Sequence, residues 1–227
     1  MALQRLLTSA ALALATAVSL APVAHAAAPV VPVVPRLDLP PHARVLLLGD
    51  SYTEGIGATP IKEGYAYKVA APLGWTLTRD GLGTTGYVNP GKQNEGRYAD
   101  RLWRHPADGY DAIFIQGSSN DQAYTSTEVK GAVNMTVRTV AVRYPHAKLV
   151  IVGLATPYGT PSADRARVNA VLKGYANEKG IRFFDPLGEQ WFSPGDGDAY
   201  ANPINGHPNN AGHLVMADRF TQDVRVS

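Results

Sequence analysis

Residues 45–51 read VLLLGDS and indicate the fold of this chain. An unbroken apolar run of this length is typical of a strand that is buried on both faces of a parallel sheet. Gly49 and Asp50 end the run and predict a turn, so Ser51 follows the carboxyl end of the predicted strand. Parallel sheets bind their ligands at that end, which makes the turn after residue 48 the first place to look for a site.

Further apolar runs along the chain predict the other strands of the sheet. They cover residues 75–77, 112–115, 149–152 and 181–184, and the first of these is the weakest. Apolar residues spaced by three and four positions predict helices over 129–144 and 168–176, and a last helix over 209–224. Strands that alternate with helices predict an α/β fold with a doubly wound parallel sheet.

Composition places the chain among ordinary folded proteins. Of its 227 residues, 45% are hydrophobic and 18% are charged, which suits one domain with a sizeable core. The net charge is only +2 and no basic stripe is present, so we expect no nucleic-acid partner. The absence of cysteine excludes disulfides, thiolate metal sites and a cysteine nucleophile.

The N-terminus has the features of an export signal. Arg5 supplies the positive charge, residues 6–20 form an apolar stretch, and Ala24-His25-Ala26 fits the small-x-small cleavage rule. The alternative, an uncleaved membrane anchor, is disfavoured because the stretch is short and Pro22 interrupts it. We therefore expect residues 1–26 to be removed after Ala26, the protein to be secreted, and no membrane span to remain.

Residues 27–42 are rich in proline and predict an extended, stiff linker. The folded domain is then expected over residues 43–227, starting near Ala43. The sequence contains no internal repeat, and we expect a monomer.

Two segments far apart in the sequence carry the chemistry of a nucleophile and a base. Ser51 is well placed as a nucleophile, but its hydroxyl needs a neighbouring base; the simpler alternative is that it only caps a helix. Histidine is the usual base near neutral pH. His207 comes just before the last helix, on a loop able to return over the sheet, whereas His213 lies inside the helix and is expected to pack or cap.

Two further loops follow predicted strands and offer hydrogen-bond donors. Asn120 is able to point its amide at a developing oxyanion, although an Asx turn is the simpler reading. Residues 81–87 read GLGTTGY, and their glycines let backbone N–H groups approach a substrate. The spacing fits neither GxxxxGK[ST] nor GxGxxG, which excludes a nucleotide-phosphate loop of those types.

Taken together and in this order, the four segments resemble the SGNH (GDSL) hydrolase family, of the secreted lysophospholipase-like or esterase type. The resemblance spans residues 43–220. The matching residues are Gly49-Asp50-Ser51, Gly86, Asn120-Asp121, and His207-Pro208 with Gly212-His213.

The resemblance implies a flavodoxin-like three-layer α/β/α sandwich with a parallel five-stranded sheet. It makes Ser51 the nucleophile and His207 the general base. The N–H groups of Ser51 and Gly86, with the Asn120 side chain, would form the oxyanion hole. Asp50 and Asp121 match family positions and are expected to brace their loops. The implied reaction needs neither a metal nor an organic cofactor.

One position departs from the family pattern. The family usually carries an Asp three residues before its catalytic His, and here that residue is Ile204. Three explanations stay open: a Ser–His dyad in which a backbone carbonyl near Ile204 holds the imidazole; an acid from Asp196 or Asp198; or a catalytically weak relative that only binds its ligand.

The sequence as a whole predicts a secreted serine esterase that acts on small carboxylic esters through an acyl-enzyme. Short or medium acyl chains are expected, including those of acetylated sugars or lipids. An acyltransferase that uses the same acyl-enzyme is an alternative. Five aromatic residues are candidates for lining a substrate pocket, although core positions are the commoner place for them: Trp75, Tyr87, Trp103, Tyr124 and Trp191.

Overall fold

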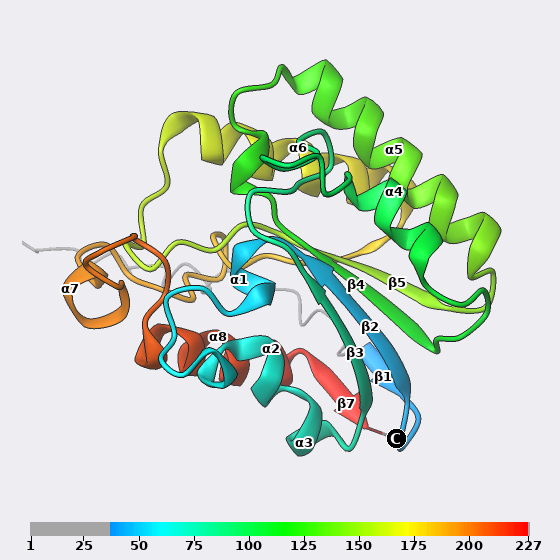
Figure 1. The fold of residues 1–227 in the computed structure, drawn as a ribbon, viewed down its shortest axis with the longest axis horizontal. Coiled ribbons are helices and arrows are strands. Elements are labelled where there is room, and N and C mark those ends of the chain that lie inside the picture. Colours follow the sequence, from blue (N-terminus) through cyan, green and yellow to red (C-terminus); the bar gives the residue numbers. More distant parts are fainter. Residues whose placement is uncertain (1–36, 227) are drawn as a thin grey trace, which may run out of the picture. The chain divides into compact units, whose positions relative to one another are not determined.

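Five parallel strands form the central sheet, in the order β3-β2-β4-β5-β6 (Figure 1). The computed structural model describes residues 37–226. The strands are β2 (Arg44–Gly49), β3 (Thr76–Gly81), β4 (Ala112–Gln116), β5 (Lys148–Val152) and β6 (Arg182–Phe184). This order is that of a flavodoxin-like sheet, in which the direction of winding reverses between the first and third strands of the fold, here β2 and β4. The predicted α/β fold with a parallel five-stranded sheet is confirmed.

Helices cover both faces of the sheet and give residues 37–226 three layers (Figure 1). One face carries α4 (Tyr98–Arg101), α5 (Ser126–Arg143) and α6 (Ala163–Lys179), and the other carries α2 (Tyr65–Lys68), α3 (Ala70–Leu73) and α8 (Asn210–Gln222). The remaining helical turns lie in the loops: α1 (Ser51–Glu54), α7 (Gly197–Tyr200), η1 (Ile61–Glu63), η2 (Leu102–Arg104) and η3 (Ser119–Asp121).

Alternate residues of β2, β4, β5 and β6 enter two separate cores. Val45 and Leu47 of β2 pack in the core beneath α8, which includes Phe220, whereas Leu46 and Leu48 pack in the core beneath α5 and α6. Because both faces of β2 are covered, its apolar run is continuous rather than alternating.

The two long helices begin earlier than their apolar spacing predicted. Thr125 caps α5 through a capping box with Glu128, and Ser162 caps α6 through the N–H of Arg165. The first turns therefore carry polar residues, which an apolar pattern does not register. The ends agree with expectation: α5 stops at Arg143, just before Pro145, and α6 ends at Gly180 in a left-handed conformation.

The expected start of the domain near Ala43 is wrong. Leu37–Leu39 form strand β1, which pairs in parallel with β7 (Val224–Val226), and the Leu39 side chain is only 1% exposed. The alternation Leu-Asp-Leu is a strand pattern that was masked by the surrounding prolines. The predicted signal peptide and residues 27–36 of the predicted linker lie outside the described residues.

No helix within residues 37–226 is long and apolar enough to cross a bilayer.

Candidate active site

Ser51 lies at the turn between β2 and α1. Asp50 caps the helix by accepting a hydrogen bond of 3.0 Å from the N–H of Tyr52. Position 49 requires glycine because a Cβ there would overlap the side chain of Thr53. Ser51 is the first residue of α1, so its N–H is one of the four helix N–H groups without an acceptor inside the helix. The turn therefore presents a hydroxyl and a free N–H from the same residue.

Asp50 has a structural place behind this turn. Its carboxylate is buried, and the Gln116 amide nitrogen, when turned toward it, donates to Oδ1 at 3.0 Å. Burial raises the pKa of Asp50 to about 6, and the hydrogen bond from Tyr52 opposes that rise. Asp50 thus braces the nucleophile turn, as the sequence predicted.

Three asparagines shape the loop that carries His207 and the start of the helix after it. Asn202 donates from Nδ2 to the Gly57 carbonyl at 3.0 Å, which ties this loop to the segment after α1. The side-chain oxygen of Asn205 accepts from the N–H of His207 at 3.0 Å and forms an Asx turn. Asn209 then caps α8 by accepting from the N–H of Gly212 at 2.9 Å. These bonds bring the two segments, distant in sequence, to the same edge of the sheet.

The imidazole of His207 joins the nucleophile to a backbone carbonyl. Its Nε2 lies 2.8 Å from Ser51 Oγ, and its Nδ1 lies 3.1 Å from the carbonyl oxygen of Asn205. Because a carbonyl only accepts, Nδ1 carries the proton and Nε2 is free to accept from the serine hydroxyl. Burial lowers the pKa of His207 below its ordinary value of 6.5, and the bond to Asn205 opposes this in part. The ring is therefore neutral at pH 7, as a base must be.

The carbonyl that holds the imidazole belongs to Asn205. The sequence had indicated a carbonyl at or near Ile204, the residue before it. The Asx turn is formed by Asn205 and His207, and Ile204 beside it is 91% exposed. Within the described residues, neither Asp196 nor Asp198 hydrogen-bonds the ring. Asp196 instead accepts from the N–H of Ser193 at 2.6 Å. Among the described residues, the hydrogen-bond partners of the ring are Ser51 and the Asn205 carbonyl.

Asn120 lies beside Ser51, as predicted. The Ser118 hydroxyl accepts from its N–H at 3.0 Å and sets the turn η3. One amide hydrogen of Asn120 is donated to the Thr85 carbonyl at 2.8 Å. The amide has a second hydrogen, and Asn120 lines the same cavity as Ser51, so a donor remains for a bound oxygen.

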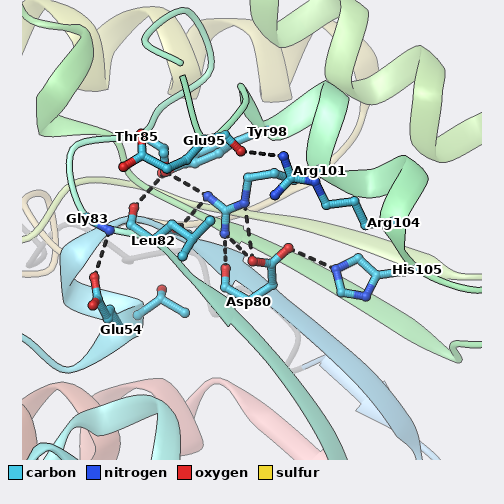
Figure 2. A network of polar contacts seen from close by, with 12 residues as sticks. Glu54, Asp80, Leu82, Gly83, Thr85, Glu95, Tyr98, Arg101, Arg104 and His105 are labelled. Carbon is cyan, nitrogen blue, oxygen red and sulfur yellow. Dashed lines mark hydrogen bonds and ion pairs between the residues drawn. The ribbon is translucent and has the colours of Figure 1, made fainter. Parts of the chain in front are cut away.

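The oxyanion role expected for Gly86 is wrong in this structure. Its N–H donates to the Asn89 carbonyl at 2.8 Å, because the Asp121 carboxylate folds this segment by accepting from the N–H groups of residues 87–89. The closer glycine is Gly83, where a Cβ would lie 3.7 Å from Ser51 Cβ. The N–H of Gly83 is held by Glu54 Oε2 at 2.7 Å (Figure 2).

A buried arginine connects the loops behind the site. Arg101 is fully buried and donates to the Gly49 carbonyl at 3.0 Å and to Thr85 Oγ1 at 2.7 Å (Figure 2). It also pairs with Asp80 at 2.6 Å, and His105 contacts the other carboxylate oxygen at 2.8 Å. Burial alone would raise the pKa of Asp80, but the hydrogen bonds from His105 and Arg101 hold it below its usual value. One side chain thus fixes the end of β2 relative to the glycine-rich loop.

His213 packs rather than reacts, as expected. Its Nδ1 accepts from the N–H of Tyr65 at 3.2 Å, and its Nε2 donates to the Ile56 carbonyl at 3.1 Å. Burial lowers the pKa of His213 to about 4, so the ring is neutral at pH 7.

The cavity in front of Ser51 has a volume of about 100 Å³. Sites for drug-sized ligands span roughly 300–1,000 Å³, so this one suits a small group. Its lining residues are Asp50, Ser51, Tyr52, Ser119, Asn120, Arg165, Asn205, Gly206 and His207.

None of the five aromatic residues proposed from the sequence lines this cavity. Trp75, Tyr87 and Trp191 are core residues, and Trp103 is exposed on η2. Arg165 and the Asn205 carbonyl were missed by sequence reasoning. The only signal for Arg165 was a cation in the first turn of a helix, and the only signal for Asn205 was an Asn two residues before His207.

A Ser–His pair at the carboxyl ends of a flavodoxin-like sheet is the arrangement expected of a hydrolase with an α/β fold. Residues 47–215 match the GDSL-like lipase/acylhydrolase family, and the chain belongs to that family. The resemblance seen in the sequence is thereby confirmed.

Individual relatives agree with this assignment. A GDSL lipase of Mycobacterium tuberculosis is 29% identical over 186 residues, which cover 78% of this chain and 79% of that protein. The structure of a lipolytic G-D-S-L family protein from Veillonella parvula has a TM-score of 0.61 at 19% identity and covers 79% of this chain and 96% of its own. A family two carbohydrate esterase from Clostridium thermocellum, solved with cellohexaose, has a TM-score of 0.63 at 18% identity and covers 82% and 64%. At these identities the two structures support the fold.

Proposed function

We propose that this chain is an exported serine esterase that hydrolyses carboxylic esters of short acyl groups. The observation that carries the proposal is the 2.8 Å contact between Ser51 Oγ and His207 Nε2, with the Asn205 carbonyl on the other ring nitrogen. Nucleophile, base and orienting group are then all present, which is the arrangement that activates a serine hydroxyl.

The reaction follows from these positions. Ser51 Oγ attacks the ester carbonyl while His207 Nε2 takes its proton, and the resulting oxyanion accepts from the Ser51 N–H and the free amide hydrogen of Asn120. His207 then returns the proton to the leaving alcohol, which departs. A water molecule, deprotonated by the same nitrogen, attacks the acyl-enzyme and releases the acid.

The Asn205 carbonyl performs one of the two tasks of a triad acid. Like a carboxylate, it holds the imidazole in the tautomer that leaves Nε2 free, but it brings less charge to stabilise the imidazolium. Loss of a triad acid costs about 10⁴ in kcat when the wrong tautomer results. Since the carbonyl maintains the correct tautomer here, the dyad is expected to lose far less.

The small cavity and the N-terminal sequence bear on the substrate. A volume of about 100 Å³ favours acetyl and similar acyl groups. The carbohydrate esterase of similar fold makes acetylated sugars one class to test. Arg5, the apolar residues 6–20 and Ala24–Ala26 support export, which would place the substrate outside the cytoplasm.

The test is turnover of p-nitrophenyl acetate and butyrate by the protein without residues 1–26. Ser51→Ala and His207→Ala should each lower kcat by more than about 10³, since both act in the same steps. Ser193→Ala, an exposed serine outside the cavity, is the matched control and should keep full activity. Turnover that survives Ser51→Ala would contradict the proposal.

The same acyl-enzyme also allows transfer to an alcohol, so the products decide between the two activities. Added sugar or glycerol acceptors should leave the free acid as the main product. A dominant acylated acceptor would identify an acyltransferase. Labelling of Ser51 by a fluorophosphonate would eliminate the remaining alternative, a relative that only binds.

A further inference from the structure

We propose that Arg165 gives this site a preference for esters that carry an anionic group, a carboxylate or a phosphate, close to the scissile carbonyl. The inference rests on the proposed esterase function and names a substrate class for it.

Arg165 forms part of the wall of the reaction cavity. It is the third residue of α6, is half-buried, and lines the same space of about 100 Å³ as Ser51, Asn120 and His207. In so small a cavity, a substrate group bound to Ser51 has little room to avoid Arg165. The guanidinium offers five N–H donors in a planar fork that suits a carboxylate or phosphate.

The carboxylates next to Arg165 in sequence or near the cavity and His207 have other hydrogen-bond partners. Asp164, its neighbour in sequence, pairs with Arg167 at 3.4 Å. Glu54 accepts from the N–H of Gly83, and Asp50 accepts from the N–H of Tyr52 behind the nucleophile turn. Among the ion pairs of residues 37–226, none contains Arg165. Its charge is therefore available to a ligand.

Helix stability does not explain a cation at this position. The N-terminal end of a helix carries partial positive charge, so a positive side chain in the first turn of α6 is unfavourable. Its field does reach the reacting pair: burial lowers the pKa of His207, and the charge of Arg165 lowers it further. The same field would attract an anionic substrate.

A competing role for Arg165 is to stabilise a different charge, the oxyanion of the transition state, and the two roles predict different results. A group that stabilises the oxyanion assists every ester equally. A group that binds a substrate anion assists only esters that carry one. Pairs of charged and neutral esters that share the rest of their structure separate the two roles.

The experiment uses two such pairs, one for each possible position of the anion. p-Nitrophenyl hemisuccinate and p-nitrophenyl butyrate have four-carbon acyl chains and differ in an acyl-side carboxylate. Acetylated glycerol 3-phosphate and monoacetylglycerol differ in an alcohol-side phosphate. In at least one pair, Arg165→Gln should lower kcat/KM for the charged ester by about 10- to 100-fold, which is the effect of losing a charge-assisted hydrogen bond. The kcat/KM for the neutral ester of that pair should change by less than about threefold.

Two controls test whether the effect comes from a charge at this position. Arg165→Lys should keep most of the preference, and added NaCl should weaken it in the wild type. Arg138→Gln removes an equal charge from an exposed position on α5, outside the cavity, and should leave the preference unchanged. Equal losses for both members of each pair, or no loss in either pair, would overturn the inference.

A binding measurement separates this inference from the proposed function. Calorimetry would compare monomethyl succinate and methyl glycerol 3-phosphate with methyl butyrate, using Ser51→Ala and the double variant Ser51→Ala/Arg165→Gln. If the double variant binds either anion about tenfold more weakly or worse, the result supports the anion site. This holds even if no ester is turned over and the esterase proposal fails. Equal affinity of both variants for both anions overturns it, even if neutral esters are hydrolysed.

Discussion

At the scale of single residues, the hydrogen bond from His207 Nδ1 to the Asn205 carbonyl determines the chemistry of the imidazole. It fixes the tautomer without bringing a second charge into the site. Ser51 therefore faces a neutral base in a partly buried position, and Arg165 is the one Lys or Arg among the residues that line the cavity.

Alanine at Asp196 or Asp198 tests this assignment. Because neither carboxylate touches the ring, each variant should retain kcat within about threefold of the wild type on p-nitrophenyl acetate. A loss of more than about 10³ for either one would identify it as the acid of a triad.

The pH dependence of kcat/KM follows from the lowered pKa of His207. Only the neutral ring accepts a proton, and burial makes the ring harder to protonate. Activity should therefore persist below pH 6.5 and fall only as the pH drops further. Arg165→Gln removes a cation that also lowers this pKa, so the acidic limb of a pH–rate profile should move upward; a downward shift would contradict the assignment.

At the scale of the elements, Arg101 of α4 holds together β2, β3 and the glycine-rich loop. Its charge is fully buried and is balanced by Asp80, which His105 also contacts. Such a pair contributes mainly by holding its partners in one geometry, since desolvation offsets much of its attraction.

Arg101→Met should destabilise the protein by about 3–5 kcal/mol, because it leaves the Asp80 charge buried without its main partner. Arg97→Met is the matched control. Arg97 forms an exposed pair with Asp100, three residues away, and its loss should cost less than about 1 kcal/mol. Urea unfolding measures the loss of unfolding free energy in both variants. Equal losses would show that the buried Arg101 pair is no more important for stability than the exposed Arg97 pair.

At the scale of the whole molecule, the two ends of the described chain meet in the small sheet formed by β1 and β7. Leu39 and Val224 are buried there, in the same core as Phe114 and Phe220. A segment rich in proline thus contributes to the main core.

Leu39→Ala should lower the free energy of unfolding by about 2–5 kcal/mol, as expected for a cavity in a core. Leu214 of α8 is 50% exposed, so Leu214→Ala is a matched control with a cost of less than about 1 kcal/mol. A change of less than 1 kcal/mol for Leu39→Ala, measured by urea unfolding, would place this segment outside the core.

His213 links global stability to pH. Its folded-state pKa of about 4 lies below the ordinary 6.5, so the unfolded chain binds a proton more readily and stability falls as the pH drops from 6.5 toward 4. Asp50, whose pKa is raised to about 6, acts in the opposite sense, because its contribution is lost as the pH rises through 6.

The difference in stability between the wild type and a His213 variant isolates the effect of His213, because both proteins contain Asp50 and its contribution cancels. His213→Gln keeps a donor and an acceptor but does not titrate. The stability advantage of the wild type over this variant should shrink by as much as about 3 kcal/mol between pH 7 and pH 4. An advantage that stays constant with pH would show that His213 does not titrate as inferred.

The local sequence determined the five strands of the central sheet, the three long helices and the two side chains proposed to react. Apolar periodicity shows which face of an element is buried, and it depends only on residues that are close in sequence. Ser51 could be recognised because it follows a predictable strand, and His207 because it precedes a predictable helix. The start of the domain was missed because β1 has its strand partner at the other end of the chain.

Only the tertiary structure decided which groups surround Ser51. The carbonyl of Asn205 replaced that of Ile204, Gly83 came closer than Gly86, and Arg165 entered the cavity wall. Each of these depends on how a loop folds against residues far away in sequence, such as Asn202 on Gly57 or Asp121 on residues 87–89. Hydrogen bonds between distant loops leave no periodic pattern in the sequence. The sequence therefore indicated Ser51 and His207, whereas the groups that surround them depend on how the chain folds.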